Sequence, residues 1–145
     1  MQSTIENRMF PRVNVEWFVV VRTDQSSIEG VTLKLSPYGA FIRCANPPKL
    51  HEILDMSLNV PDSEYTIEAA VEVVFSNQYG PDDRISPRGM GVRFLDMSNE
   101  DRQIIAKAVL QQLQSEKKEI DPQKLQTLQT LITIPSEIGS EDALK

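Results

Sequence analysis

Residues 65–75, Tyr-Thr-Ile-Glu-Ala-Ala-Val-Glu-Val-Val-Phe, carry the clearest pattern in the chain. Apolar side chains recur at every second position, while Thr66, Glu68 and Glu72 fall on the opposite face. A period of two indicates a β-strand with one buried face. That face is expected to hold Tyr65, Ile67, Ala69, Val71, Val73 and Phe75. Shorter strands are expected at residues 13–22, 31–36, 40–44, 56–60 and 90–94.

The short strand at residues 31–36 bears directly on function. Strict alternation predicts Val31, Leu33 and Leu35 on one face of it. The other face would then carry Thr32, Lys34 and Ser36. Pro37-Tyr38-Gly39 ends the strand as a turn.

Beyond residue 97 the period changes from two to about four. Ser98 is a good helix N-cap, and Ile105, Val109 and Leu113 form one apolar stripe behind it. Asp121-Pro122 interrupts this helix and begins a second, shorter one. The expected fold is therefore mainly β, a six-stranded antiparallel barrel with C-terminal α-helices.

The expected organisation has four parts. Residues 1–12 form an N-terminal arm with little that could be buried, and residues 13–97 form the barrel. Residues 98–119 form the first helix, and residues 120–145 a second short helix with a frayed tail. In the second helix, Leu125, Leu128, Leu131 and Ile132 make a stripe too apolar for a solvated helix. It is expected to pack on the barrel, on the first helix, or on a second chain in a homodimer.

Composition narrows the function classes. The 145 residues carry a net charge of −6 and a pI of about 4.8, which argues against general DNA or RNA binding and against anionic membranes. A small anionic ligand is not excluded, because two or three local arginines are enough to bind one. No apolar run approaches the ~18 residues of a membrane span, so a cytoplasmic location is expected.

Nothing in the sequence suggests catalysis. The single cysteine, Cys44, excludes an intramolecular disulfide and a thiolate zinc site, and it is expected to be a small core residue. Asp82-Asp83 offers too few ligands at defined spacing for a metal. No nucleophile elbow, P-loop or zinc-protease motif occurs. We expect no enzyme activity, no catalytic residue, no metal and no cofactor.

Two short motifs suggest a ligand site. Arg8-Met-Phe-Pro-Arg12 places two guanidinium forks just before the first strand, and each fork can bind a phosphate or a guanine O6/N7 edge. Ser36-Pro-Tyr-Gly39 puts a small hydroxyl and a glycine at a strand end. Solvated surface charges and an ordinary turn are the alternatives. Tyr38 could stack on a base or cover the barrel.

These motifs together resemble the PilZ domain family, bacterial receptors for cyclic di-GMP. The resemblance rests on RxxxR, on SxxG followed by Ala40-Phe-Ile42, and on Gly89-Met-Gly-Val-Arg-Phe94, and it covers roughly residues 6–114. It implies an arginine arm, a six-stranded barrel and a closing helix. It also implies that the ligand cyclic di-GMP contacts four residues here. They are Arg8, Arg12, Ser36 and Gly39, and Lys34 completes the predicted ligand-binding set.

Lys34 departs from that family, which carries Asp or Asn at this position. Guanine presents N1–H and N2–H donors, and an ammonium group cannot accept from them. Lys34 could instead bind guanine O6 or N7, bind a phosphate, or point into solvent. Loss of the acceptor would cost roughly 1–3 kcal/mol of binding free energy.

Two functions follow from the resemblance and its exception. The first is a sensor that binds cyclic di-GMP and relays binding to a protein partner. The second is a degenerate PilZ module that binds a protein but no nucleotide. The intact Arg8 and Arg12 favour the sensor, and Lys34 favours the module.

Overall fold

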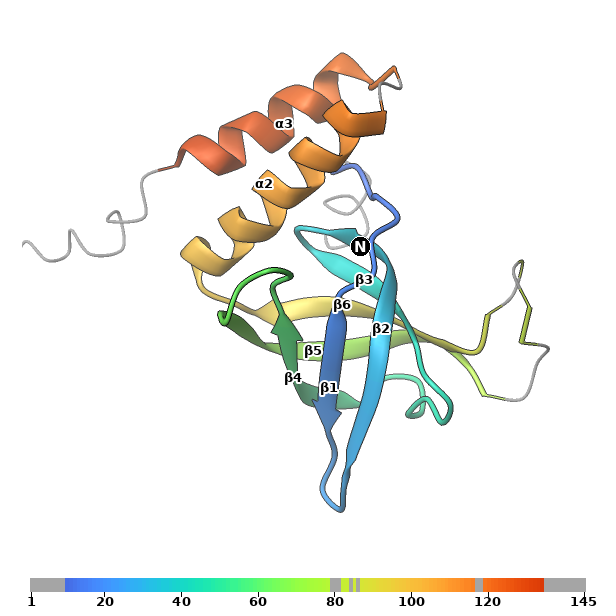
Figure 1. Cartoon of the computed structure of the whole chain (residues 1–145). Coiled ribbons are helices and arrows are strands. Elements are labelled where there is room, and N and C mark those ends of the chain that lie inside the picture. Colours follow the sequence, from blue (N-terminus) through green and yellow to red (C-terminus); the bar gives the residue numbers. More distant parts are fainter. Residues whose placement is uncertain (1–9, 79–81, 84, 86, 117–118, 135–145) are drawn as a thin grey trace, which may run out of the picture.

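Six antiparallel strands close into a barrel in the computed structural model, which describes residues 10–78, 82–83, 85, 87–116 and 119–134. The strands are β1 (Phe18–Arg22), β2 (Ser27–Ser36), β3 (Gly39–Arg43), β4 (Ile53–Asn59), β5 (Thr66–Asn77) and β6 (Gly89–Asp96). Their order around the barrel is β1-β2-β3-β6-β5-β4. Two helices follow, α2 (Asn99–Glu116) and α3 (Pro122–Thr133), and lie over one end of the barrel (Figure 1). The predicted fold class is confirmed.

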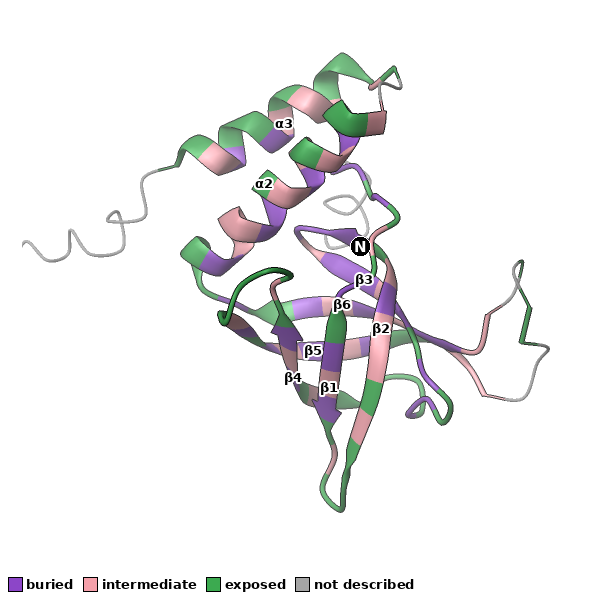
Figure 2. Ribbon diagram, viewed as in Figure 1, coloured by how far each residue is buried: buried purple, intermediate pink, exposed green. Residues whose placement is uncertain are grey.

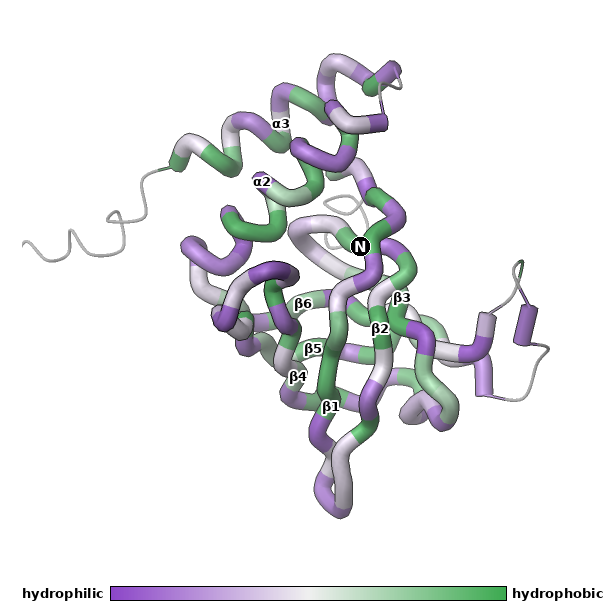
Figure 3. Tube along the Cα trace, viewed as in Figure 1, coloured by the Kyte–Doolittle hydropathy of each residue, from purple (hydrophilic) through white to green (hydrophobic). Residues whose placement is uncertain are grey.

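The barrel interior is filled by the alternating apolar positions of its strands. Polar and apolar residues alternate along these strands (Figure 3), as a sheet with one buried face requires. The fully buried side chains include Val19, Val21, Ile42, Met56, Leu58, Ile67, Val71 and Val73. The outer surface of the strands is therefore available for function.

Two β-bulges interrupt the predicted alternation, so the predicted facing of some residues in β2 and β5 is wrong. In β2 the register shifts between Thr32 and Lys34, so Thr32 is buried while Leu33 and Lys34 both line an outer cavity. In β5 the register shifts between Val73 and Phe75, and Phe75 turns outward with 55% of its side chain exposed. A bulge adds one residue to a strand, which reverses the faces of the residues that follow.

The other end of the long predicted strand also differs from expectation. Tyr65 precedes β5 and is 48% exposed, and its hydroxyl donates a hydrogen bond to Asp101 of α2. The tyrosine therefore ties the barrel to the helix. It does not fill the barrel.

The segment before β1 runs antiparallel beside β2 but does not form a regular hydrogen-bonded ladder with it. Val13 makes an isolated bridge with Leu35, in which each N–H donates to the other residue's carbonyl, at 3.0 and 2.9 Å. Thr32 binds the following residues of this segment, since its hydroxyl donates to Val15 O and accepts from Trp17 N–H. The predicted first strand therefore begins as a loosely paired segment, and regular pairing starts at Phe18.

Replacing Thr32 by valine should destabilise the protein. The change leaves the buried Trp17 N–H and Val15 carbonyl without their partner, at a cost of about 1–3 kcal/mol in the free energy of unfolding. Urea unfolding would measure this loss. Thr32→Ser keeps the hydroxyl and is the matched control, expected to lose less. A valine variant as stable as the native protein would contradict this assignment.

The two helices pack on each other within one chain. Ser98 caps α2 through its hydroxyl, which accepts from Asp101 N–H, and Asp121 caps α3 by accepting from Gln123 N–H. The α2 stripe is buried, as are Leu128 and Leu131 of α3 (Figure 2). Of the three expected partners for the apolar stripe of α3, the structure shows the first helix. The homodimer stays a prediction.

Candidate functional site

An open cavity of about 850 Å³ lies on the outer face of the barrel, between the segment before β1 and the strands β2, β3 and β5. Its walls are formed by Arg12, Asn14, Val15, Glu16, Leu33, Lys34, Phe41, Phe75, Asn77, Ile85 and Pro87. A smaller hollow of about 290 Å³ shares Arg12, Phe41 and Phe75 with it and adds Ser36 and Gly39. Every described residue of the predicted site therefore lines one of two hollows that share a wall. Arg8 lies outside the described residues.

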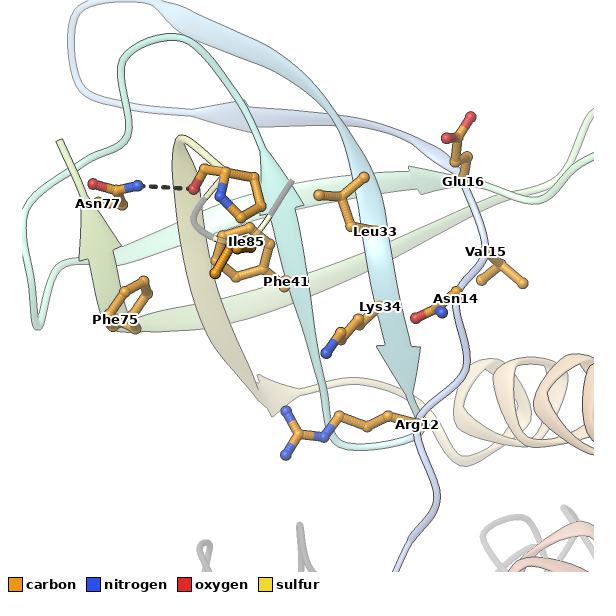
Figure 4. Close-up of a pocket in the computed structure, with 11 residues that line it drawn as sticks. Arg12, Asn14, Val15, Glu16, Leu33, Lys34, Phe41, Phe75, Asn77 and Ile85 are labelled. Atoms are coloured by element: carbon orange, nitrogen blue, oxygen red, sulfur yellow. Dashed lines mark hydrogen bonds between the residues drawn. The ribbon is translucent and has the colours of Figure 1, made fainter. Parts of the chain in front are cut away.

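Two cationic side chains reach into the cavity. Arg12 and Lys34 are exposed, and both point in the direction of the aromatic wall (Figure 4). Neither has an ion pair with any residue that the structure describes. Glu16 also lines the cavity, but Figure 4 shows its carboxylate directed away from these two cations. The cavity is therefore suited to an anion in a protein of net charge −6.

An aromatic pair forms the opposite wall. The ring centroids of Phe41 and Phe75 are 6.2 Å apart, and the rings are tilted by 45°. Both residues pair with Gly91 of the intervening strand β6, where a Cβ atom would lie 3.4 Å from Phe75 Cβ and 3.9 Å from the Phe41 ring. Phe75 is exposed and Phe41 is half-buried, and an outward-facing aromatic pair of this kind suits a planar base, since every base has a π-face to stack.

Sequence reasoning missed this aromatic wall. Phe75 was expected in the core because strict alternation places it with Val73, and the bulge between them reverses its direction. Phe41 lies between the buried Ala40 and Ile42, so its outward direction does follow from alternation. The sequence therefore carried one signal for the aromatic wall, a large aromatic side chain directed outward from a strand.

Ser36 and Gly39 have structural roles in the turn between β2 and β3. Ser36 is 3% exposed, and its hydroxyl accepts from Tyr38 N–H at 3.2 Å and donates to Gly39 O at 3.4 Å. A Cβ atom at Gly39 would lie 2.7 Å from Val92 O, so only glycine lets β3 approach β6 this closely. Contact of these two residues with a ligand stays a prediction.

The described end of the arm, residues 10–12, is fixed to the barrel and the helices by Phe10. Its side chain is 9% exposed and its ring lies 4.8 Å from the ring of Tyr38. The Arg102 guanidinium lies 4.2 Å from the centre of the Tyr38 ring, and Arg102 donates to Pro37 O. The expectation that residues 1–12 carry little that could be buried is wrong at Phe10 and Pro11, which are buried. Tyr38 covers the barrel and lines neither hollow at the site.

Groups outside the cavity show no catalytic arrangement among the described residues. Burial raises the pKa of the Cys44 thiol to about 11, so the thiol is protonated at neutral pH. Cys44 is a buried core residue. On another part of the outer surface, a hydrogen bond from Arg93 lowers the pKa of Glu72, and His51 lies 3.6 Å from the same carboxylate. No group of three or more His, Cys, Asp or Glu residues in the described part of the chain could hold a metal ion. None of its helices is long and apolar enough to span a membrane.

The chain was compared with known families and structures. A family model described as "PilZ domain" matches residues 6–111. No curated protein matches the chain significantly. The solved structure of the Bacillus subtilis inhibitor of motility (MotI/DgrA) is similar, with a TM-score of 0.63 and 16% identity over 74% of this chain. The match spans 51% of MotI, so the present chain corresponds to about half of that protein.

A second similar structure is the PilZ domain, with c-di-GMP, of YcgR from Escherichia coli. Its TM-score is 0.57 at 12% identity, and the match covers 74% of this chain and 92% of that one. At these identities the two structures establish a shared fold.

Proposed function

Because this chain belongs to the PilZ domain family, we propose that its outer cavity binds cyclic di-GMP and that binding is relayed to a protein partner. One observation carries the proposal. Two cations without ion pairs among the described residues, Arg12 and Lys34, line a cavity of about 850 Å³ whose opposite wall is an outward-facing aromatic pair. A site of this size and composition suits a cyclic dinucleotide, which carries two phosphates and two planar bases.

The cavity has side chains suited to both the phosphates and the bases of this ligand. The guanidinium fork of Arg12 can bind a phosphate or a guanine edge with two parallel bonds, and Lys34 supplies a second, point-like charge. Phe41 and Phe75 offer a stacking surface for a guanine. The E. coli YcgR PilZ domain, which has the same fold, was solved with c-di-GMP, and this supports the same ligand class here.

The arm provides the route to a partner. Phe10 lies between Arg8 and Arg12 in the sequence and is buried beside Tyr38 and a groove on α3 lined by Thr127 and Leu131. If the arm closes on a ligand, it must either pull on this contact or pivot about it. Binding would thereby change the helical surface that a partner protein can recognise.

Phe10→Ala should uncouple the arm from the helices. In the native protein, cyclic di-GMP is expected to change amide exchange in α3; in the alanine variant this response should be lost. Affinity should also fall by about tenfold, since ordering each freed residue costs about 1–2 kcal/mol. Phe10→Leu keeps an apolar contact and is the control. An α3 response of equal size in the alanine variant would show that Phe10 does not couple the two regions.

A protein-binding module without nucleotide binding is the second candidate. Specific observations favour it: the Ser36 hydroxyl and Gly39 both have structural roles in the turn, and Lys34 offers no acceptor. Isothermal titration of the purified chain with cyclic di-GMP separates the two candidates. Saturable heat of binding would support the sensor. No heat of binding up to about 1 mM nucleotide would mean a binding free energy weaker than about −4 kcal/mol, and would support the protein-binding module. A cytoplasmic location stays a prediction, which localisation of a tagged chain would test.

A further inference from the structure

If the cavity binds cyclic di-GMP as proposed, the acceptor for guanine comes from a group other than the Lys34 side chain. The N1–H and N2–H groups of guanine are donors, and the ammonium of Lys34 has no lone pair to accept from them. Three other lining residues described by the structure carry side-chain oxygens. They are Asn14, Glu16 and Asn77.

Two of these three are poorly placed. The side-chain amide of Asn77 donates to Pro87 O at 2.9 Å, which holds it at the far end of the cavity (Figure 4). The Glu16 carboxylate points away from Arg12 and Lys34 in the same view. Asn14 is exposed, and its side chain makes no hydrogen bond with any residue that the structure describes.

The pairing of the arm with β2 places Asn14 opposite Lys34. Val13 and Leu35 form a reciprocally hydrogen-bonded antiparallel pair, and both side chains are buried. The next residues along each strand, Asn14 and Lys34, therefore face outward as a cross-strand pair. Figure 4 shows them side by side at the rim of the cavity.

We propose that Asn14 reads the guanine edge in this chain, while Lys34 acts with Arg12 as a cation for the phosphates. The Asn14 amide can accept from guanine N1–H through its oxygen and donate to O6 through its nitrogen. The acceptor that Lys34 lacks is thereby supplied from the adjacent strand segment. This inference rests on the proposed nucleotide binding.

An amide and a carboxylate at position 14 differ in a measurable way. Rotated by half a turn, the amide also matches the N6–H donor and N1 acceptor of adenine, whereas a carboxylate matches only the two guanine donors. Asn14→Asp should therefore raise the preference for cyclic di-GMP over cyclic di-AMP. The ratio of the two affinities isolates the base, because both nucleotides carry the same phosphates.

The test is calorimetric titration of both nucleotides into the native chain and its Asn14→Ala, Asn14→Asp, Glu16→Ala and Asn59→Ala variants. Asn14→Ala should weaken cyclic di-GMP binding by about tenfold, the worth of one hydrogen bond to a base edge. Asn14→Asp should raise the preference for guanine by at least about tenfold. Asn59→Ala, the control at an exposed asparagine of β4 outside both hollows, should leave both affinities within about twofold. Glu16→Ala tests whether the carboxylate that lines the cavity is the acceptor. Melting temperatures should not change, since the Asn14 side chain is exposed.

Distinct results would overturn the inference and the proposed function. If the native chain binds cyclic di-GMP and both Asn14 variants keep its affinity and its base preference, Asn14 does not read the guanine. A loss in Glu16→Ala in place of Asn14→Ala would move the role to Glu16. If the native chain binds neither nucleotide, the proposed function fails and this inference fails with it.

Discussion

Arg12→Ala is expected to weaken the binding of cyclic di-GMP severely. Arg12 lines both hollows of the site, and its guanidinium has no ion pair within the described part of the chain that would hold it elsewhere. A bidentate, charge-assisted contact contributes about 3 kcal/mol, so its loss should weaken binding by about a hundredfold or more. Isothermal titration would measure the effect.

The matched control for this variant is Arg22→Ala. Arg22 is also an exposed arginine of the barrel, but it pairs with Glu68 at 3.0 Å and lines neither hollow. Its loss should leave nucleotide affinity unchanged. If Arg12→Ala bound cyclic di-GMP as tightly as the native chain, the ligand would not occupy this cavity.

Lys34→Asp should weaken binding by about thirtyfold or more, which is about 2 kcal/mol of binding free energy, the size of one charge-assisted contact. The variant replaces a cation beside Arg12 with an anion, which turns attraction for the phosphates into repulsion. The affinity of the native chain should also fall as salt is raised, and that of the aspartate variant should fall less steeply. Titrations at two salt concentrations would measure both effects. Lys107→Asp changes an exposed lysine of α2 in the same way and should have little effect.

The opposite result at position 34 is equally informative. Tighter binding of cyclic di-GMP by Lys34→Asp would mean that the guanine edge lies at β2, where the carboxylate could accept from it. The phosphate role of Lys34 would then be wrong, and Asn14 would not be needed as the acceptor.

The architecture was predictable because it depends on patterns that many residues share. Alternation along residues 65–75 and the period near four after Ser98 each repeat one signal several times, so no single exception hides them. The buried stripe of Ile105, Val109 and Leu113 and the hydroxyl cap of Ser98 were both found where the sequence places them.

The site was less predictable because it depends on exceptions to those patterns. Bulges in β2 and β5 turn Leu33 and Phe75 outward, and a bulge changes facing without changing composition. The burial of Phe10 against Tyr38 joins residues that are far apart in sequence and share no periodic pattern. The pairing of Val13 with Leu35, which sets Asn14 beside Lys34, is likewise a long-range contact that local propensity does not report.

The central claim is that cyclic di-GMP binds in the outer cavity of the barrel, and an amide chemical-shift titration of the isotopically labelled native chain tests it most directly. We predict saturable shifts at Asn14, Lys34, Phe41 and Phe75, which line that cavity from four separate segments. Tyr65 lies outside both hollows and should not shift. An unchanged spectrum at saturating nucleotide, or shifts confined to residues outside the cavity, would contradict the claim.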